Sequence, residues 1–268
     1  MLHYVRRGGG RPLVLLHGFM GGSGYWARQL ESWAGQFDVI APDLPGFAGS
    51  AMLDPCRSIE SMARSVLHFL DELRIGRILL LGHSMGGMVA QQMALDEPDR
   101  ICKVVLYGTS PTGALPGRFE PIDASIERLR RDGVAATARM IVGTWFRDGC
   151  KHERHDLCVR AGEGASLEAA VAALQALSSW DVRPMLAQVQ VPALVISGDQ
   201  DRSCPPEQAY RLWRSLRNGS LCIIPGSAHA AHLEQPEIFD LAVMGFLLRD
   251  ASSTRCTLAL PASNLRAS

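Results

Sequence analysis

The sequence lacks an excess of charge of either sign. Its 27 Lys and Arg residues equal its 27 Asp and Glu residues, so the formal net charge at pH 7 is zero. No run of basic residues is longer than two or three. Because nucleic acids and anionic membranes attract proteins through clustered positive charge, we expect neither as a partner.

Long hydrophobic runs are also missing. No stretch approaches the roughly 18 consecutive apolar residues of a membrane-spanning helix, and the opening MLHYVRRGGG does not contain the apolar segment of a secretory signal. The seven cysteines are odd in number and irregularly spaced, which favours reduced thiols over a disulfide framework. We therefore expect a cytoplasmic protein without membrane association.

The composition suits one large α/β domain. Of the 268 residues, 47% are hydrophobic, enough to bury a core without disulfides or metals. Short apolar runs alternate with helical patterns, which predicts a mostly parallel sheet flanked by helices. A helix is expected over residues 58–73, with Ser58 as its N-cap. Strands are expected at residues 2–6, 14–16, 39–41, 78–81, 104–107, 194–197 and 221–224.

The most informative stretch is LLLGHSMGG, residues 79–87, where an apolar run stops at a serine between glycines. A serine at such a strand-to-helix turn is held in strained geometry, at a cost of about 1–3 kcal/mol, and needs small neighbours such as Gly82 and Gly86. The helix that begins near Met85 points unpaired N–H groups at the same spot. The motif alone is moderately specific, so a base, an acid and a second oxyanion donor must accompany Ser84.

Four further motifs complete a resemblance to the α/β-hydrolase superfamily, and in particular to esterases and 3-oxoadipate enol-lactonases. The resemblance extends from near the first strand to about Leu248. The motifs are LVLLHGFMGG at 13–22, VIAPDLPGFAGS at 39–50, ALVISGDQDRSCPP at 193–206 and IIPGSAHAAHLEQPEIF at 223–239.

The resemblance implies a role for each matched residue. Ser84 is the expected nucleophile, Asp201 the acid and His229 the base, in the chain order of this family. The backbone N–H groups of Phe19 and Met85 are the expected oxyanion donors. In this chemistry the imidazole takes the serine proton during attack, and the carboxylate fixes the tautomer of the imidazole.

Two other residues are alternatives for the acid and the base, and two positions depart from the family motifs. Asp199 lies in the same loop as Asp201, but the family spacing favours Asp201. His232 falls three residues after the expected base. Ala48 and Ala228 stand where the family usually has glycine, and the backbone of the loop that contains Ala48 is expected to differ locally.

Other histidines and cysteines are expected to be structural. His17 and His83 sit beside the two oxyanion elements and are expected to support them by hydrogen bonds. Neither a cofactor nor a metal is expected, since no zinc-ligand spacing is matched by Cys150, His152, His155 and Cys158.

Residues 111–184 interrupt the alternation of strands and helices. Helical stretches at 122–131, 134–146, 154–160 and 166–179 resemble the helical cap that the family inserts after its sixth strand. We thus divide the chain into a hydrolase core formed by residues 1–110 and 185–250, the cap between these two segments, and a flexible tail at 251–268. Candidate substrate-binding residues of the cap, with packing as the alternative, are Met140, Trp145, Phe146 and Trp180. Candidates for holding a substrate carboxylate, most of them expected to be solvated, are Arg128, Arg130, Arg131, Arg139, Arg147 and Arg154.

The main functional hypothesis is a serine hydrolase that cleaves a small carboxylic ester or lactone through an acyl-enzyme on Ser84. Hydrolytic carbon–carbon cleavage of ring-fission dienoates, or a lyase reaction like that of a menaquinone-pathway synthase, would use the same residues. A receptor of the same fold that binds a small molecule is the alternative from another class. The expected partner is a small-molecule substrate, and nothing in the sequence indicates an oligomeric state.

Overall fold

A single sheet organises the structure, a computed structural model that describes residues 1–115, 118 and 120–249. Within these residues the strand order is β1-β3-β2-β4-β5-β6-β7. β1 is antiparallel to β3, and all other pairs are parallel. The predicted mostly parallel sheet is confirmed. The strands are β1 (Tyr4–Gly8), β2 (Arg11–Leu16), β3 (Phe37–Pro42), β4 (Ile78–His83), β5 (Ile101–Tyr107), β6 (Ala193–Gly198) and β7 (Gly219–Ile224).

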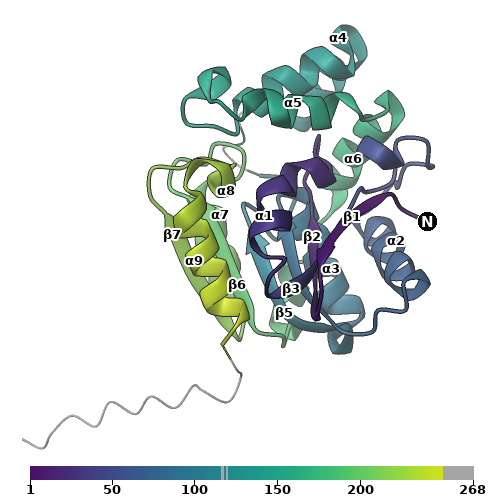
Figure 1. The fold of residues 1–268 in the computed structure, drawn as a ribbon. Helices are drawn as coiled ribbons and strands as arrows, with labels where there is room; N and C mark the ends of the chain where they lie inside the picture. The colour runs from purple at the N-terminus through teal and green to yellow at the C-terminus, as the bar shows by residue number, and fades with distance from the viewer. Residues whose placement is uncertain (116–117, 119, 250–268) are drawn as a thin grey trace, which may run out of the picture.

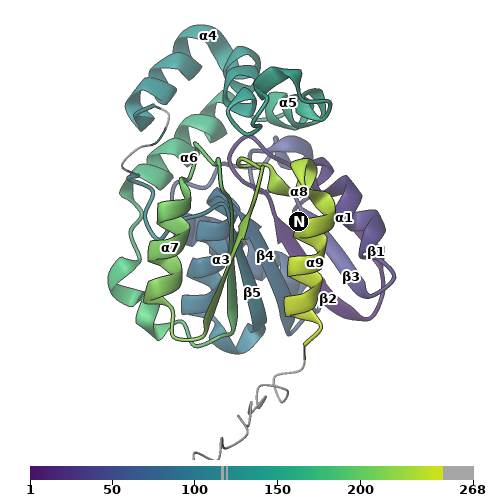
Figure 2. The same cartoon turned by 90° about the vertical axis from the view of Figure 1, so that its left-hand side faces the viewer.

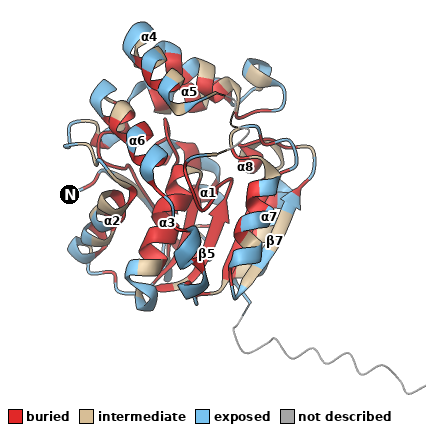
Figure 3. Ribbon diagram, turned by 180° about the vertical axis from the view of Figure 1, so that it is seen from behind, coloured by how far each residue is buried: buried red, intermediate tan, exposed pale blue. Residues whose placement is uncertain are grey.

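Helices cover both faces of the sheet. α1 and α9 pack on one face, and α2, α3 and α7 on the other (Figures 1 and 2). The inner strands β3, β4 and β6 are therefore buried along their whole length, as their largely apolar sequences predict. Figure 3 shows this buried layer between helices whose outer sides are exposed. The helices are α1 (Ala27–Ser32), α2 (Ile59–Glu72), α3 (Met85–Asp96), α7 (Pro206–Ser215), α8 (Ala231–Glu234) and α9 (Pro236–Leu247).

The predicted helix at 58–73 forms as α2. The Ser58 hydroxyl accepts the Ser61 N–H at 3.1 Å, and the Ser61 hydroxyl accepts the Ser58 N–H at 3.1 Å. This reciprocal cap satisfies two backbone donors that a helix N-terminus otherwise leaves unpaired. The buried side of α2 carries Ile59, Met62, Ala63, Val66, Phe69 and Leu70.

Three cap helices lie between β5 and β6: α4 (Ile122–Gly143), α5 (His155–Glu163) and α6 (Leu167–Ser179). They stand at one end of the sheet (Figure 1), and α5 packs against the 3-10 turns Ser23–Trp26 and Ala48–Ser50, which follow β2 and β3. α4 is interrupted at Gly133, whose φ of 81° separates the two helices that the sequence predicts there.

The cap helices follow the fifth described strand rather than a sixth, because only β1 precedes β2 in this sheet. The tail expected at 251–268 lies outside the described residues.

Candidate active site

Ser84 sits at the sharp turn between β4 and α3. Its φ of 56° and ψ of −120° are strained for a residue with a side chain, at a cost of about 1–3 kcal/mol. Backbone crowding explains the flanking glycines: a Cβ on Gly86 would lie 2.5 Å from the carbonyl oxygens of Leu16 and His17, and one on Gly82 would overlap the Gly86 carbonyl. The turn therefore holds the Ser84 side chain out of the helix that follows it.

His229 and Asp201 meet on the loops that follow β7 and β6. His229 Nδ1 lies 2.7 Å from Asp201 Oδ2, and the two side chains are 2% and 0% exposed. The other carboxylate oxygen, Oδ1, accepts the N–H groups of Ser203 at 2.8 Å and Cys204 at 2.9 Å. These bonds fix the carboxylate, so that Nδ1–H of His229 donates to it and Nε2 remains for proton transfer.

The structure distinguishes Asp201 and His229 from the two alternative residues, Asp199 and His232. Asp199 accepts the Ser227 N–H at 3.1 Å and thereby shapes the loop before His229. His232 is fully buried between the Tyr107 hydroxyl at 3.2 Å and the Tyr25 carbonyl at 3.3 Å. Burial lowers the pKa of His232 to about 3, so this imidazole is neutral at pH 7.

Two buried side chains hold the backbone of His229. Its carbonyl oxygen accepts the Tyr107 hydroxyl at 2.7 Å and His83 Nε2–H at 3.0 Å. His83 directly precedes Ser84, so one imidazole connects the nucleophile turn to the loop of the base. The sequence predicted the supporting role of His83 but not that of Tyr107, which looked like an ordinary strand residue.

His17 supports the segment after β2 that carries Phe19, one of the two expected oxyanion donors. Its Nε2 accepts the Leu44 N–H at 2.9 Å, which places the proton on Nδ1 and makes it a donor to the Gly18 carbonyl at 2.8 Å. Burial lowers the pKa of His17 and of His83, so both act as neutral hydrogen-bonding groups. The expectation that these two histidines are supports is confirmed.

The expected oxyanion donors lie on segments that adjoin Ser84. Met85 is the first residue of α3, where backbone N–H groups have no partner inside the helix. Gly18 packs so closely on the nucleophile that an added Cβ would be 2.8 Å from Ser84 Cβ. Phe19 follows it and lines the same cavity as Ser84 and His229.

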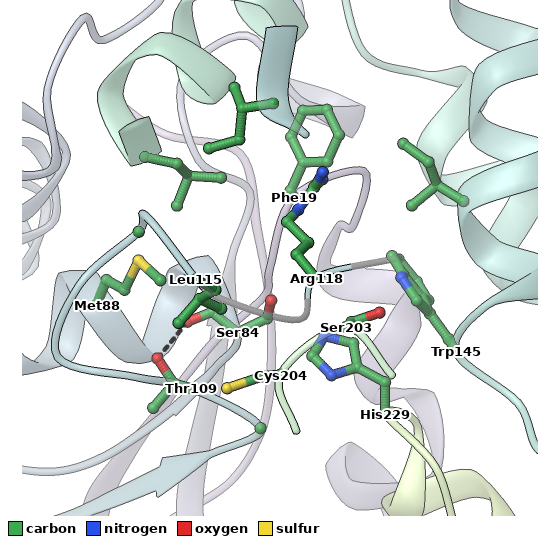
Figure 4. Close-up of a pocket in the computed structure, with 15 residues that line it drawn as sticks. Phe19, Ser84, Met88, Thr109, Leu115, Arg118, Trp145, Ser203, Cys204 and His229 are labelled. Atoms are coloured by element: carbon green, nitrogen blue, oxygen red, sulfur yellow. Dashed lines mark hydrogen bonds between the residues drawn. The ribbon is translucent and has the colours of Figure 1, made fainter. Parts of the chain in front are cut away.

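This cavity has a volume of about 60 Å³ and is shown in Figure 4. Its apolar lining comes from the core and the cap helices alike. Polar groups are fewer, and Arg118 is the single permanently charged side chain among the described lining residues. The lining residues are Phe19, Ser84, Met88, Gly108, Thr109, Gly113, Leu115, Arg118, Ile122, Ile141, Trp145, Leu177, Ser203, Cys204 and His229.

Trp145 is the one predicted substrate-binding residue that lines this cavity. Phe146 is fully buried and stacks on His152 with ring centroids 4.3 Å apart. Trp180 donates its indole N–H to Gln92 at 3.2 Å, and Met140 lines a separate hollow on the cap. These three side chains therefore serve packing or other surfaces rather than the cavity.

Several residues that line the cavity are not among those predicted from the sequence. Met88 lies one helical turn after Ser84, so the helical repeat could have identified it. Leu115, Ile141, Leu177 and Arg118 carry no comparable signal, because their directions depend on how the cap packs.

The described residues contain no group of three or more His, Cys, Asp or Glu side chains arranged to hold a metal. Across the same described ranges, none of the helices combines the length and hydrophobicity needed to cross a bilayer.

The mostly parallel sheet, with a strained serine turn after β4 and helices inserted before β6, defines an α/β-hydrolase fold. Residues 13–240 match the Alpha/beta hydrolase family, and the protein belongs to this family.

Individual relatives differ in the reactions that they are named for. The chain is 29% identical to a putative carbamate hydrolase RutD of Rhizobium rhizogenes, over 92% of this chain and 97% of that one. It is 32% identical to a 2-hydroxy-6-oxononadienedioate/2-hydroxy-6-oxononatrienedioate hydrolase of Burkholderia vietnamiensis, over 92% and 91%. Among solved structures, the enol-lactonase of Burkholderia xenovorans superposes with a TM-score of 0.85 at 26% identity, over 92% of this chain and 96% of that one.

Proposed function

We propose that this α/β hydrolase cleaves a small carboxylic ester or lactone through an acyl-enzyme on Ser84. One observation supports the proposal: His229, which lies 2.7 Å from the buried Asp201 carboxylate, lines the same cavity as the strained Ser84. The similarity to a solved enol-lactonase supports a lactone or ester as the substrate class.

The reaction follows from these positions. His229 Nε2 takes the proton of Ser84 Oγ as Oγ bonds to the substrate carbonyl carbon. The carbonyl oxygen becomes an oxyanion, which the N–H groups of Phe19 and Met85 stabilise. The C–O bond then breaks, and the leaving alkoxide takes the proton from His229; in a lactone this alkoxide stays attached to the acyl group. Water, deprotonated by His229, releases the acid and restores Ser84.

A second candidate is hydrolytic carbon–carbon cleavage of a ring-fission dienoate. The 32% identity to a hydrolase named for such substrates favours it. The same nucleophile and base would serve, with a carbon leaving group in place of the alkoxide.

A substrate panel tests the proposal. Purified protein is assayed on short p-nitrophenyl esters, on lactones and on ring-fission dienoates, and kcat/KM is compared across the classes. We expect esters or lactones to turn over many times, and Ser84→Ala to lose at least about 1,000-fold in kcat. Ser215→Ala, an exposed serine on α7, is the matched control and should keep full activity.

Three results would count against the proposal. Higher kcat/KM on dienoates than on esters or lactones would favour carbon–carbon cleavage as the function. Activity that persists in Ser84→Ala would exclude an acyl-enzyme on Ser84. A protein that binds these compounds and turns over none would be a receptor.

A further inference from the structure

The outer side of α9 is apolar, although this helix lies at the surface of the molecule (Figures 1 and 2). Its sequence, PEIFDLAVMGFL, contains two charged residues, Glu237 and Asp240. A surface helix normally carries polar residues on the side that faces water, whereas apolar residues on all sides are typical of a helix that is covered all round. The composition of α9 therefore indicates that another molecule or segment covers its outer side.

Four residues form a continuous line along this outer side, which we call the α9 stripe. They recur at intervals of three, four and three positions, so they lie on one side of the helix. The three large side chains, Ile238, Leu241 and Leu248, are 41%, 76% and 52% exposed. The opposite side of α9 is already packed against the core by Phe239 and Val243. The members of the α9 stripe are Ile238, Leu241, Gly245 and Leu248.

Gly245 is the small member of the α9 stripe. A Cβ added to Gly245 would meet no atom within 4 Å, so packing inside the described part of the chain does not require a glycine there. Glycine is less favourable than alanine in the interior of a helix. The close approach of a second helix would account for a glycine at this position, because the absent side chain leaves room for a large one.

The α9 stripe is complementary to itself when two copies of α9 pack antiparallel. A twofold axis at the level of residue 243 places Leu241 of one copy opposite Gly245 of the other, so that a large side chain meets a small one. The same axis places Ile238 opposite Leu248, because these two residues are equally far from it. One arrangement therefore pairs every member of the stripe.

Charged residues at the two ends of the α9 stripe follow the same symmetry. The twofold arrangement places Glu237 of one copy opposite Arg249 of the other, and it forms this contact twice. The Glu237 side chain is 79% exposed and lies 3.2 Å from Arg28 in an ion pair that water screens, so it can share a second cation. Arg249 directly follows the helix and is exposed.

Lys103 of β5 fixes the end of α9 that carries Arg249. Its Nζ donates to the carbonyl oxygens of Phe246 at 2.8 Å and Leu247 at 3.2 Å, and also to that of Arg249. The last carbonyl groups of a helix have no partner inside it, so these bonds anchor its C-terminus. Residues 248 and 249 therefore project from a backbone that is held in place before a partner binds, which lowers the cost of association.

We propose that the α9 stripe is the interface of a homodimer in which a second copy of this chain packs its own α9 antiparallel across it. A second copy is the favoured occupant because the stripe matches itself both in the size of its residues and in the charges at its ends, as a twofold interface requires. No residue of α9 is among the described residues that line the Ser84 cavity. The inference is therefore independent of the proposed function.

Sedimentation velocity on the full chain tests the proposal. A single pair of helices buries less area than a standard interface, so we expect a monomer–dimer equilibrium with a dissociation constant of about 1–100 μM. Leu241→Glu places a carboxylate at the centre of the interface in each copy and should raise this constant by at least about 100-fold. Met52→Glu is the matched control, since Met52 is 97% exposed and lies outside α9, and it should leave the constant unchanged.

Exchange of the end charges tests the antiparallel arrangement. Glu237→Arg places like charges opposite each other at both ends and should raise the dissociation constant by about 10-fold, and Arg249→Glu should do the same. The protein with both substitutions has opposite charges again and should return to within about 3-fold of the wild type. Loss of the ion pair between Glu237 and Arg28 would not be rescued by Arg249→Glu. Thermal unfolding by circular dichroism confirms that each variant is folded.

Several results would overturn the inference. Wild type that remains monomeric up to about 100 μM would do so, whether the stripe then binds phosphatidylcholine vesicles or becomes available for dimerisation only after deletion of residues 250–268. A dimer that Leu241→Glu leaves intact would place the interface elsewhere. A charge-exchanged protein that associates as weakly as the single variants would exclude the antiparallel arrangement.

Discussion

Replacement of Asp201 by Asn is expected to abolish catalysis while leaving the fold in place. Asp201 Oδ1 accepts the N–H groups of Ser203 and Cys204, and an Asn side-chain oxygen can keep both bonds. Its amide nitrogen then faces His229 Nδ1, where the carboxylate oxygen lies 2.7 Å away in the native protein. An amide N–H there requires an unprotonated Nδ1, which moves the imidazole proton to Nε2.

The size of the effect follows from that change of tautomer. An imidazole protonated on Nε2 cannot take the Ser84 proton, and the imidazolium of the transition state loses its counter-charge. We expect Asp201→Asn to lower kcat by about 1,000- to 10,000-fold, with a much smaller change in KM. Steady-state kinetics on a p-nitrophenyl ester measure the loss, and thermal unfolding by circular dichroism confirms that the variant is folded.

Asp199→Asn provides the matched control, since Asp199 is in the same loop and its side chain bonds only to the Ser227 N–H among the described residues. It should keep kcat within a few-fold of wild type. Equal losses in the two variants, or an Asp201→Asn enzyme with more than a tenth of wild-type kcat, would refute this reasoning.

Three further predictions concern stability and positioning. The pKa of His232 is about 3 in the folded protein, below its unfolded value of about 6.5, so the stability from keeping it neutral is lost as pH falls below about 6.5. His232→Gln should therefore reduce the pH dependence of the free energy of unfolding between pH 7 and 5 by up to about 1.4 kcal/mol per pH unit, measured in urea, and an unchanged slope would contradict this. Ala48 has a φ of 44°, which favours glycine, so Ala48→Gly should raise the free energy of unfolding by up to about 1 kcal/mol. Ala51 has a φ of −57°, so the control Ala51→Gly should lower the free energy of unfolding. A destabilised Ala48→Gly variant together with a stabilised Ala51→Gly variant would contradict this reasoning. Tyr107→Phe leaves the His229 carbonyl with one fewer donor and should cost about 1–3 kcal/mol of stability and lower kcat more than KM; unchanged stability and kcat would argue against a positioning role.

Sequence patterns could predict the sheet because each strand has a local signature. Buried parallel strands are short apolar runs, and such runs became the inner strands of the sheet, among them β4, β5 and β6. Ser84, its flanking glycines and Asp201 also lie in short motifs. Such motifs can be recognised from the sequence because all of their residues are close together in the chain. Family spacing accordingly favoured Asp201 over Asp199, and Asp201 is the residue that contacts His229.

The contribution of the cap to the site could not be predicted in the same way. Trp145 and Phe146 are neighbours in sequence, yet Trp145 lines the cavity and Phe146 packs on His152. Helical periodicity says which residues share a side of a helix, but not which side faces Ser84. The side that faces Ser84 depends on how α4 and α6 pack over the core. Arg118 and Leu177 can therefore be identified as lining residues of the cavity only from the structure.

Labelling by an organophosphonate tests the central claim most directly. A fluorophosphonate should react once with folded wild-type protein, giving a single mass increase that peptide mass spectrometry places on Ser84. Ser84→Ala should remain unlabelled, and Ser215→Ala should be labelled like wild type. Folded wild-type protein that gains no mass, or that carries the label on another residue, would contradict the account.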